Sequence, residues 1–282
     1  MSLNRQHKSF SPCPQKIRTR IMGILNLTPD SFSADGLLTK NSGIEGVARY
    51  ARKLVSEGAD IIDLGAESSR PGAKPVTLKE ELRRLIPVVE KLSGAISVPI
   101  SIDTYKPEVA RIALSAGASI VNDISGLRDA RMIEVIAKSG AGVVIMHRKG
   151  RPGNMQNNPR YRFVIEEVKA FLSDALNKAE KQGINRKRII VDPGIGFGKT
   201  LEHNLEILRR LRDFKSLGCP LMVGTSRKSF IGKILDLPVN KRLAGTLASL
   251  VVAVVNGADI LRVHDVKFAV EAIGVAEAII IP

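Results

Sequence analysis

The sequence has no tryptophan, and three tyrosines and eight phenylalanines bring its aromatic content to only 4% of 282 residues. A core built from this chain must therefore pack mainly aliphatic side chains. Surfaces that bind nucleic acid combine a basic stripe with aromatic residues on which bases can stack. The few aromatic residues do not form such a stripe, which argues against nucleic acid as a partner.

Cysteine and long apolar runs are also scarce. Only Cys13 and Cys219 occur, too few for a disulfide framework or a cysteine-rich zinc site. Apolar runs such as residues 247–255 are far shorter than a membrane-spanning helix requires. No N-terminal segment has the pattern of a secretory signal. We therefore expect a cytoplasmic protein that does not associate with membranes.

Acidic residues are the scarcer charge, with 28 Asp and Glu against 43 Lys and Arg, and the formal net charge is +15. Such a charge favours anionic ligands, among them nucleic acid, acidic lipid and phosphorylated substrates. The basic residues are spread along the whole chain, and residues 5–20 come nearest to a basic arm. Most of this charge is interpreted as solvated surface, with a non-catalytic polyanion-binding protein as the alternative.

Short runs rich in Ile and Val alternate with longer segments of helical spacing from residue 20 onward. The short runs lack polar alternation, which is typical of strands buried on both faces. Eight strands, each followed by a helix, predict an α/β protein with a single (β/α)8 TIM-barrel domain at residues 20–282, after an irregular basic leader at residues 1–19. An open doubly wound sheet is the alternative. The predicted strands are 21–25, 61–64, 99–102, 120–122, 142–146, 188–191, 220–223 and 260–263, and the predicted helices are 44–57, 78–93, 107–116, 132–139, 163–182, 201–211, 240–256 and 267–278.

Polar residues follow nearly every predicted strand. In a TIM barrel, catalytic groups lie at the carboxyl ends of the strands. A single Asp or Asn at such a place is commonly a turn former or a helix cap. Eight polar strand ends that converge on one barrel mouth require a further explanation. The candidates are Asn26, Arg70, Asp103, Asn122, Asp192, Lys228, Arg262 and His264, whereas His147 is interpreted as a core histidine.

The candidates divide by their chemistry. Cationic side chains suit phosphate oxygens, and arginine can bind them through two parallel hydrogen bonds; these are Arg70, Lys228, Arg262 and His264. Three others, Asp103, Asn122 and Asp192, can accept hydrogen bonds from a planar heterocycle. Asn26 offers a carbonyl oxygen, which Mg²⁺ can bind together with water and substrate phosphate. These side chains predict a site for a planar nitrogen heterocycle that carries a phosphate or diphosphate.

Residues 194–200 read Gly-Ile-Gly-Phe-Gly-Lys-Thr and superficially look like a phosphate-binding loop. A Walker A motif requires glycine at the position of Pro193. We therefore interpret these glycines as part of a strand-to-helix loop and reject an NTPase function.

The chain resembles the dihydropteroate synthase family, the sulfonamide-inhibited enzymes of folate biosynthesis, from about residue 20 to the C-terminus. Each motif alone is moderately specific, whereas all of them in order and at these spacings are strongly specific. The motifs are residues 26–33, 67–72, 101–104, 122–126, 146–156, 192–199, 226–230 and 262–266.

The resemblance implies an Mg²⁺-assisted transferase that joins 6-hydroxymethyl-7,8-dihydropterin diphosphate to 4-aminobenzoate, giving 7,8-dihydropteroate and diphosphate. It assigns pterin binding to Asp103, Asn122, Met146, Asp192 and Lys228. It assigns the diphosphate to Asn26, Arg70, Arg262 and His264, with Asn26 also on Mg²⁺. It assigns aminobenzoate to Ser69, Pro71, Phe197 and Ser229. The residues implied in catalysis are Asp103, Lys228, Arg262 and His264.

Some expectations rest on the resemblance alone or depart from it. Family barrels commonly pair through their last helices, and the Ala- and Val-rich residues 243–255 are compatible with a homodimer. Ser69 stands where Thr is usual, Asp35 is displaced by one position, and Arg148-Lys149 stands where Met often begins its segment. A pterin-dependent methyltransferase on the same barrel is the enzymatic alternative, but it has no leaving diphosphate for the cationic residues to neutralise.

Overall fold

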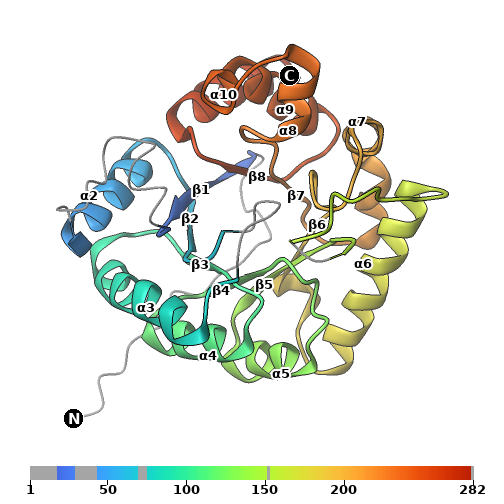
Figure 1. Cartoon of the computed structure of the whole chain (residues 1–282). Coiled ribbons are helices and arrows are strands. Elements are labelled where there is room, and N and C mark those ends of the chain that lie inside the picture. Colours follow the sequence, from blue (N-terminus) through green and yellow to red (C-terminus); the bar gives the residue numbers. More distant parts are fainter. Residues whose placement is uncertain (1–17, 29–42, 69–74, 151–152, 281–282) are drawn as a thin grey trace, which may run out of the picture.

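Eight parallel strands form the centre of the computed structural model, which describes residues 18–28, 43–68, 75–150 and 153–280 (Figure 1). Their order is β6-β5-β4-β3-β2-β1-β8-β7, and an isolated parallel bridge between Val191 and Leu221 joins the two ends of this order. The predicted TIM barrel is thereby confirmed. The strands are β1 (Arg20–Asn26), β2 (Ile61–Gly65), β3 (Ile100–Asp103), β4 (Ile120–Asp123), β5 (Gly142–Met146), β6 (Ile189–Asp192), β7 (Met222–Val223) and β8 (Ile260–Val263).

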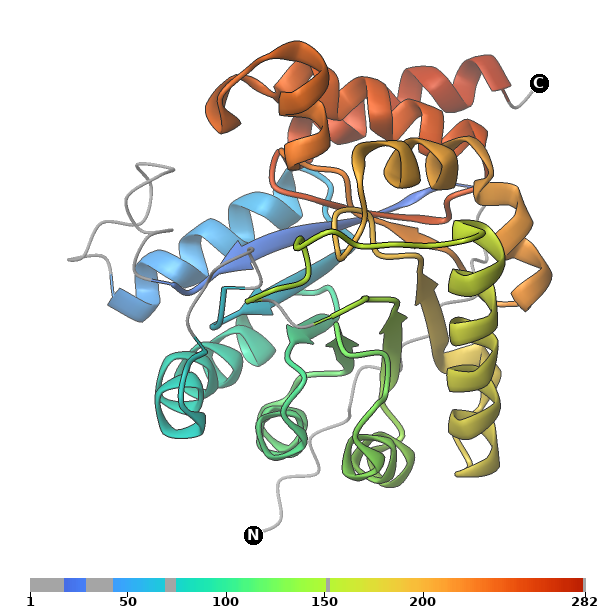
Figure 2. The same ribbon diagram turned by 45° about the vertical axis from the view of Figure 1, so that its right-hand side comes forward.

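Helices surround the strands on the outside of the barrel (Figures 1 and 2). Their apolar faces pack on the outward side chains of the strands in one continuous aliphatic core. None of the helices in the described ranges has both the length and the hydropathy needed to cross a bilayer. The α-helices are α2 (Gly43–Ser56), α3 (Leu78–Ala95), α4 (Pro107–Ala116), α5 (Ala130–Ser139), α6 (Val164–Lys181), α7 (Leu201–Arg209), α8 (Ser229–Leu235), α9 (Leu243–Val255) and α10 (Val266–Ile280), and the 3₁₀ turns are η1 (Arg186–Arg188), η2 (Leu211–Leu217) and η3 (Val239–Lys241).

Local sequence signals account for several helix ends. The Thr77 hydroxyl accepts a hydrogen bond from the Glu80 amide and caps α3, as predicted. Pro107 opens α4, where a missing amide proton has no cost, and Gly117 ends that helix with φ at 119°. The short helix α8 was not predicted, because it interrupts what the sequence analysis treated as a loop. Residues 1–17 of the predicted leader lie outside the described residues.

The barrel interior contains an apolar layer near its amino-terminal end. Its seven buried side chains come from seven different strands and form a cluster separate from the outer core. Because side chains alternate across a strand, the residues two positions further along also point inward. Counting two positions on from the apolar layer places polar residues of β2, β4, β6 and β8 in the next layer, toward the mouth. The apolar layer consists of Met22, Ile61, Ile120, Val144, Ile190, Met222 and Ile260.

Candidate active site

A small cavity of about 50 Å³ opens at the carboxyl ends of the strands, directly above the apolar layer. Eight of the predicted site residues line it, so the structure brings together side chains that are up to 161 positions apart in the chain. Ile24, Ile124, Gly224 and Ser226 complete its wall. The predicted residues are Asp103, Asn122, Met146, Asp192, Phe197, Lys228, Arg262 and His264.

Arg262 joins two carboxylates across the barrel interior. Its Nε lies 2.7 Å from Asp63 Oδ2, and its Nη2 lies 2.7 Å from Asp103 Oδ2. Asn122 Nδ2 donates to the same Asp63 oxygen at 3.2 Å. Arg262 Nη1 makes no hydrogen bond to the described part of the chain. The guanidinium therefore balances two buried acids and still carries a donor for an anionic ligand.

Asp63 is the member of this network that the sequence analysis missed. It is fully buried in the middle of β2, within the apolar run Ile61-Ile62-Asp63-Leu64-Gly65. A carboxylate inside such a strand is costly unless it is paired, and this was the signal that could have revealed it. The predicted candidates lie at or after the ends of the predicted strands, whereas Asp63 lies within β2, two residues before its end.

Burial shifts the ionisation of the cavity groups. It raises the pKa of Asp103 to about 7, against the opposing effect of Arg262. Burial also raises the pKa of Asp192, partly offset by Lys228, and lowers the pKa of Lys228 to about 8. Perturbed groups that gather in one cavity are typical of functional sites.

Lys228 lies between Asp192 and the β6–α7 loop. Its Nζ donates to the Ile195 carbonyl and lies 4.8 Å from the centre of the Phe197 ring. The same loop also contacts Asp192, because the Gly194 amide donates to Asp192 Oδ1 at 2.7 Å. Ser229 follows Lys228 as the first residue of α8 and is exposed. The candidates for the pterin and for aminobenzoate thus lie next to one another.

His264 is held by Ser226. The Ser226 hydroxyl oxygen accepts the His264 amide at 3.3 Å and lies 3.0 Å from His264 Nδ1. A hydroxyl that accepts from the amide can donate its own proton to Nδ1, which places the ring proton on Nε2. This tautomer presents a donor of the kind that an anion requires.

Asn26 is the last residue of β1 and is not among the residues that line the cavity. Its Oδ1 would lie 3.2 Å from a Cβ atom on Gly65, and Asp103 Oδ2 would lie 3.9 Å from that same Cβ. The two oxygens therefore lie near the same glycine. No group of three or more His, Cys, Asp or Glu ligands occurs among the described residues. The donors here are hard oxygens, which fit a Mg²⁺ ion that takes its other ligands from water and phosphate.

Ser69, Arg70 and Pro71 lie outside the described residues. His147 is buried, as predicted for a core histidine, and its Nδ1 lies 2.9 Å from Lys199 Nζ. Lys199 is itself 3% exposed. The lysine that gave residues 194–200 the look of a phosphate loop therefore points into the protein, in agreement with the rejection of an NTPase function.

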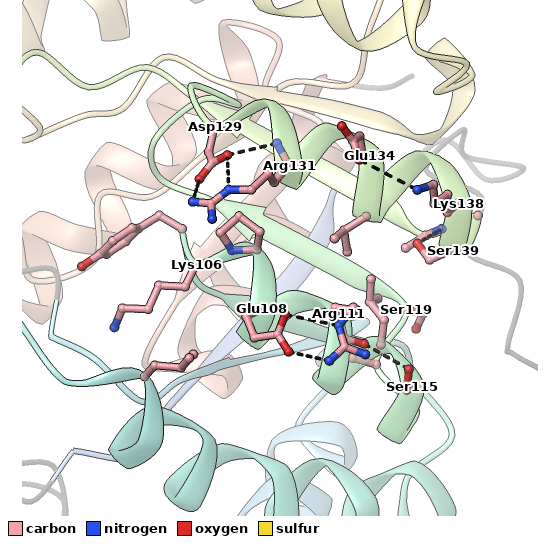
Figure 3. Close-up of a pocket in the computed structure, with 18 residues that line it drawn as sticks. Lys106, Glu108, Arg111, Ser115, Ser119, Asp129, Arg131, Glu134, Lys138 and Ser139 are labelled. Carbon is pink, nitrogen blue, oxygen red and sulfur yellow. Dashed lines mark hydrogen bonds and ion pairs between the residues drawn. The ribbon is translucent and has the colours of Figure 1, made fainter.

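A much larger hollow of about 1020 Å³ lies elsewhere, in the groove between α4 and α5 on the outside of the barrel (Figure 3). Its charged residues largely pair with one another: Arg111 with Glu108, Arg131 with Asp129, and Lys138 with Glu134. The side chains of these six residues are exposed to solvent or partly so. We therefore place the site at the barrel mouth, where the charged and polar groups are buried.

Comparison with known proteins agrees with this placement. The pattern that defines the family of pterin-binding enzymes matches residues 22–264, which include every candidate from Asn26 to His264. The chain belongs to the pterin-binding enzyme family. Dihydropteroate synthase from Escherichia coli K12 is 47% identical over 258 residues, covering 92% of this chain and 90% of that protein. The resemblance to dihydropteroate synthases is thereby confirmed.

Solved structures of the family superpose closely on the barrel. A dihydropteroate synthase from Clostridium difficile, determined in the presence of pteroic acid, is 47% identical with a TM-score of 0.86, covering 93% of this chain and 97% of that one. The enzyme from Xanthomonas albilineans with 4-aminobenzoic acid is 41% identical with a TM-score of 0.87, covering 94% of both chains. Pterin-binding enzymes of known structure thus share both the fold and a large part of the sequence.

Proposed function

We propose that the protein is a dihydropteroate synthase, a transferase that condenses 6-hydroxymethyl-7,8-dihydropterin diphosphate with 4-aminobenzoate. The supporting observation is the buried cavity in which Asp103, Asn122, Asp192 and Lys228 meet, in a chain 47% identical to a dihydropteroate synthase. No observation favours the methyltransferase or the polyanion-binding alternative.

The pterin ring would bind to the polar layer. Asp192 keeps an orientation fixed by the Gly194 amide, so that its carboxylate can accept hydrogen bonds from the amidine-like edge of the ring. Asn122 Oδ1 is buried and has no hydrogen-bond partner among the described residues. A buried acceptor of this kind is costly unless a ligand or water satisfies it, and a ring N–H would do so. Met146 would pack on the face of the ring.

The reaction requires charge to be balanced at two places. Cleavage of the pterin methylene C–O bond leaves a resonance-stabilised cation on the ring and negative charge on the departing diphosphate. The Asp103 carboxylate would stabilise the cation, while Arg262 and His264 would donate to the diphosphate oxygens. Asn26 would hold Mg²⁺, which when bound neutralises part of the diphosphate charge. The amine of aminobenzoate then forms the C–N bond and loses one proton.

Aminobenzoate would lie near the mouth, against Phe197 and Ser229. Phe197 contacts the Lys228 ammonium, and Ser229 follows Lys228 in the sequence. Both residues would therefore place aminobenzoate beside the pterin. Arg70 for the diphosphate, with Ser69 and Pro71 for aminobenzoate, remain predictions from the resemblance. The cytoplasmic location also remains a prediction.

We further propose a homodimer formed through α9 and α10, which lie side by side (Figure 2). Large apolar side chains on these helices are exposed, including Val275 at 63% and Ile279 at 79%. Exposed apolar patches of this kind mark interaction sites. Light scattering of the wild type and of Val275→Asp tests the dimer: a monomeric wild type would contradict it.

The function itself is tested by incubating the purified protein with the pterin diphosphate and Mg²⁺, with and without 4-aminobenzoate. Diphosphate release that rises with aminobenzoate, together with dihydropteroate formation, is expected. If the pterin binds and no product forms, the synthase function is wrong and a pterin binder or methyltransferase takes its place.

A further inference from the structure

The β6–α7 loop, residues 193–200, rests on a buried lysine that the proposed reaction does not use. Lys199 Nζ lies 2.9 Å from the Gly194 carbonyl oxygen, 3.2 Å from the Phe197 carbonyl oxygen and 2.9 Å from His147 Nδ1. Burial lowers the pKa of Lys199 well below its ordinary value, opposed by the Asp192 carboxylate; in the protonated form Nζ has three protons, which match these three acceptors in number. One side chain thus hydrogen-bonds to both halves of the loop and to His147, which directly follows β5.

His147 is suited to the acceptor role in this cluster. Burial, and then the nearby Lys199, lower the pKa of its imidazole to about 2. The ring is therefore neutral, and Nδ1 can accept a hydrogen bond from Lys199 when Nε2 carries the ring proton. The His147 amide also donates to the Asp192 carbonyl at 2.9 Å, which keeps the two strand ends together.

The loop approaches its neighbour too closely for ordinary side chains. At Gly194, with φ at 69°, a Cβ atom would lie 1.9 Å from the His147 carbonyl oxygen. At Gly198, with φ at 63°, it would lie 2.2 Å from the Lys149 carbonyl oxygen. Both positions therefore require glycine. Gln156 and Tyr161 also donate to the loop, at the Gly196 and Gly198 carbonyls, but Lys199 bonds both to Gly194, in its first half, and to Phe197.

Three groups of the candidate site contact this loop or belong to it. Gly194 donates to Asp192, the Ile195 carbonyl accepts from Lys228, and Phe197 packs against the Lys228 ammonium. Lys199 donates to the carbonyl oxygens of Gly194 and Phe197, which flank the Ile195-Gly196 segment. A shift of the loop would move Phe197 itself, whereas Asp192 ends β6 and Lys228 precedes α8, so both are anchored outside the loop.

We propose that Lys199, with His147 as its acceptor, is a positioning residue for the second substrate. It holds the β6–α7 loop so that Phe197, the aminobenzoate candidate of that loop, is in place before 4-aminobenzoate binds. This inference rests on the proposed function. It also separates Lys199 from a purely structural lysine, whose loss would lower stability without favouring one substrate over the other.

Lys199→Met tests the inference, because methionine has a similar length and no donor. The KM for 4-aminobenzoate is expected to rise at least about tenfold, whereas the KM for the pterin diphosphate changes less than about threefold. Lys138→Met, an exposed substitution on α5, is the matched control and leaves both constants unchanged. Equal changes in the two KM values, or none, would overturn the proposal.

A pair of variants at His147 covers the case in which Lys199→Met fails to fold. Asparagine can place an oxygen near the position of Nδ1 and keep an acceptor for Lys199, whereas leucine removes it. His147→Leu is expected to reproduce the selective rise in the aminobenzoate KM, and His147→Asn to restore a near-normal value. Identical behaviour of these two variants would contradict the role of the Lys199–His147 contact.

Hydrogen exchange separates a failure of this inference from a failure of the proposed function. An inactive wild type would reject the synthase function and leave the loop test standing. Amides of residues 194–198 should exchange at least about tenfold faster in His147→Leu than in the wild type, with α4 and α5 unchanged. Unchanged exchange in the loop would overturn the positioning role whatever the activity.

Discussion

Two successive layers inside the barrel differ sharply in chemistry, although the same strands supply both. The lower layer contains Ile120, Ile190 and Ile260, and it packs as a closed apolar cluster. Two residues further along β4, β6 and β8 stand Asn122, Asp192 and Arg262, which line the cavity. A step of two residues along the strand, about 6.5 Å, separates apolar packing from a polar site.

The difference shows which of the two layers lowers the stability of the fold. The lower layer gains from burial, because apolar side chains fill the narrow interior with native density. In the upper layer, Asp63 Oδ1, Ser101 Oγ and Asn122 Oδ1 are buried without a hydrogen-bond partner among the described residues. Unsatisfied buried atoms reduce stability, so we interpret the upper layer as arranged for a ligand. Mutations in the upper layer should therefore lower activity strongly, whereas mutations in the lower layer should mainly lower stability.

The largest effect on activity is expected from Asp192→Ala in the upper layer. Loss of the acceptor for the ring should lower kcat/KM by about a thousandfold or more, because a site that hydrogen-bonds its substrate depends strongly on each polar partner. Calorimetry with the pterin should show no binding. Near-wild-type pterin affinity in a folded Asp192→Ala protein would contradict the assigned role.

Arg262→Ala should have the next largest effect and should act on both stability and activity. It leaves Asp63 and Asp103 buried without their cation, which is expected to lower the free energy of unfolding by about 3 kcal/mol. The activity should fall by about a hundredfold, since the diphosphate also loses a donor. Urea denaturation and steady-state kinetics measure the two effects. A variant as stable as the wild type would show that the two acids are neutralised in another way.

The pH dependence of Asp103 should separate activity from stability. Since its pKa is raised from 3.8 to about 7, kcat/KM should fall about tenfold for each pH unit below 7, as the carboxylate is protonated. The stability contribution has the opposite sign: it is complete below pH 4 and is lost as the pH rises through 7. A pH–rate profile measures the fall in kcat/KM, with Asp103→Asn as the control that lacks the titration.

Ile190→Ala in the lower layer should have the smallest effect on activity. The cavity left in the apolar layer is expected to lower the free energy of unfolding by about 2–4 kcal/mol. Turnover well below the melting temperature should stay within about threefold of wild type, because the polar layer keeps its own ion pairs and hydrogen bonds. A large loss of kcat in a folded Ile190→Ala protein would mean that the two layers are not independent.

The strands were predictable because each lies buried on both faces and so reads as a short aliphatic run. Residues 142–146 and 260–263 were predicted with the observed bounds, and the other strands with shifts of one or two residues at their ends. Helix α8 was missed, because its seven residues are too few to show a helical period. Eight of the predicted candidates line one cavity, and Asp63 was missed because it lies within β2 and not at its end.

Periodicity and strand-end chemistry by themselves determined the barrel and the residues around its mouth, since alternation along a strand and the parallel arrangement need no further information. Only the tertiary structure decided which polar atoms meet. Arg262 was predicted for an anion, yet it bonds to Asp63 and Asp103, which lie 199 and 159 residues away in the chain. Lys199 gave residues 194–200 a superficial likeness to a phosphate loop and is buried beneath that loop. Pairing of this kind depends on distances between strands and loops far apart in sequence, and no local pattern records those distances.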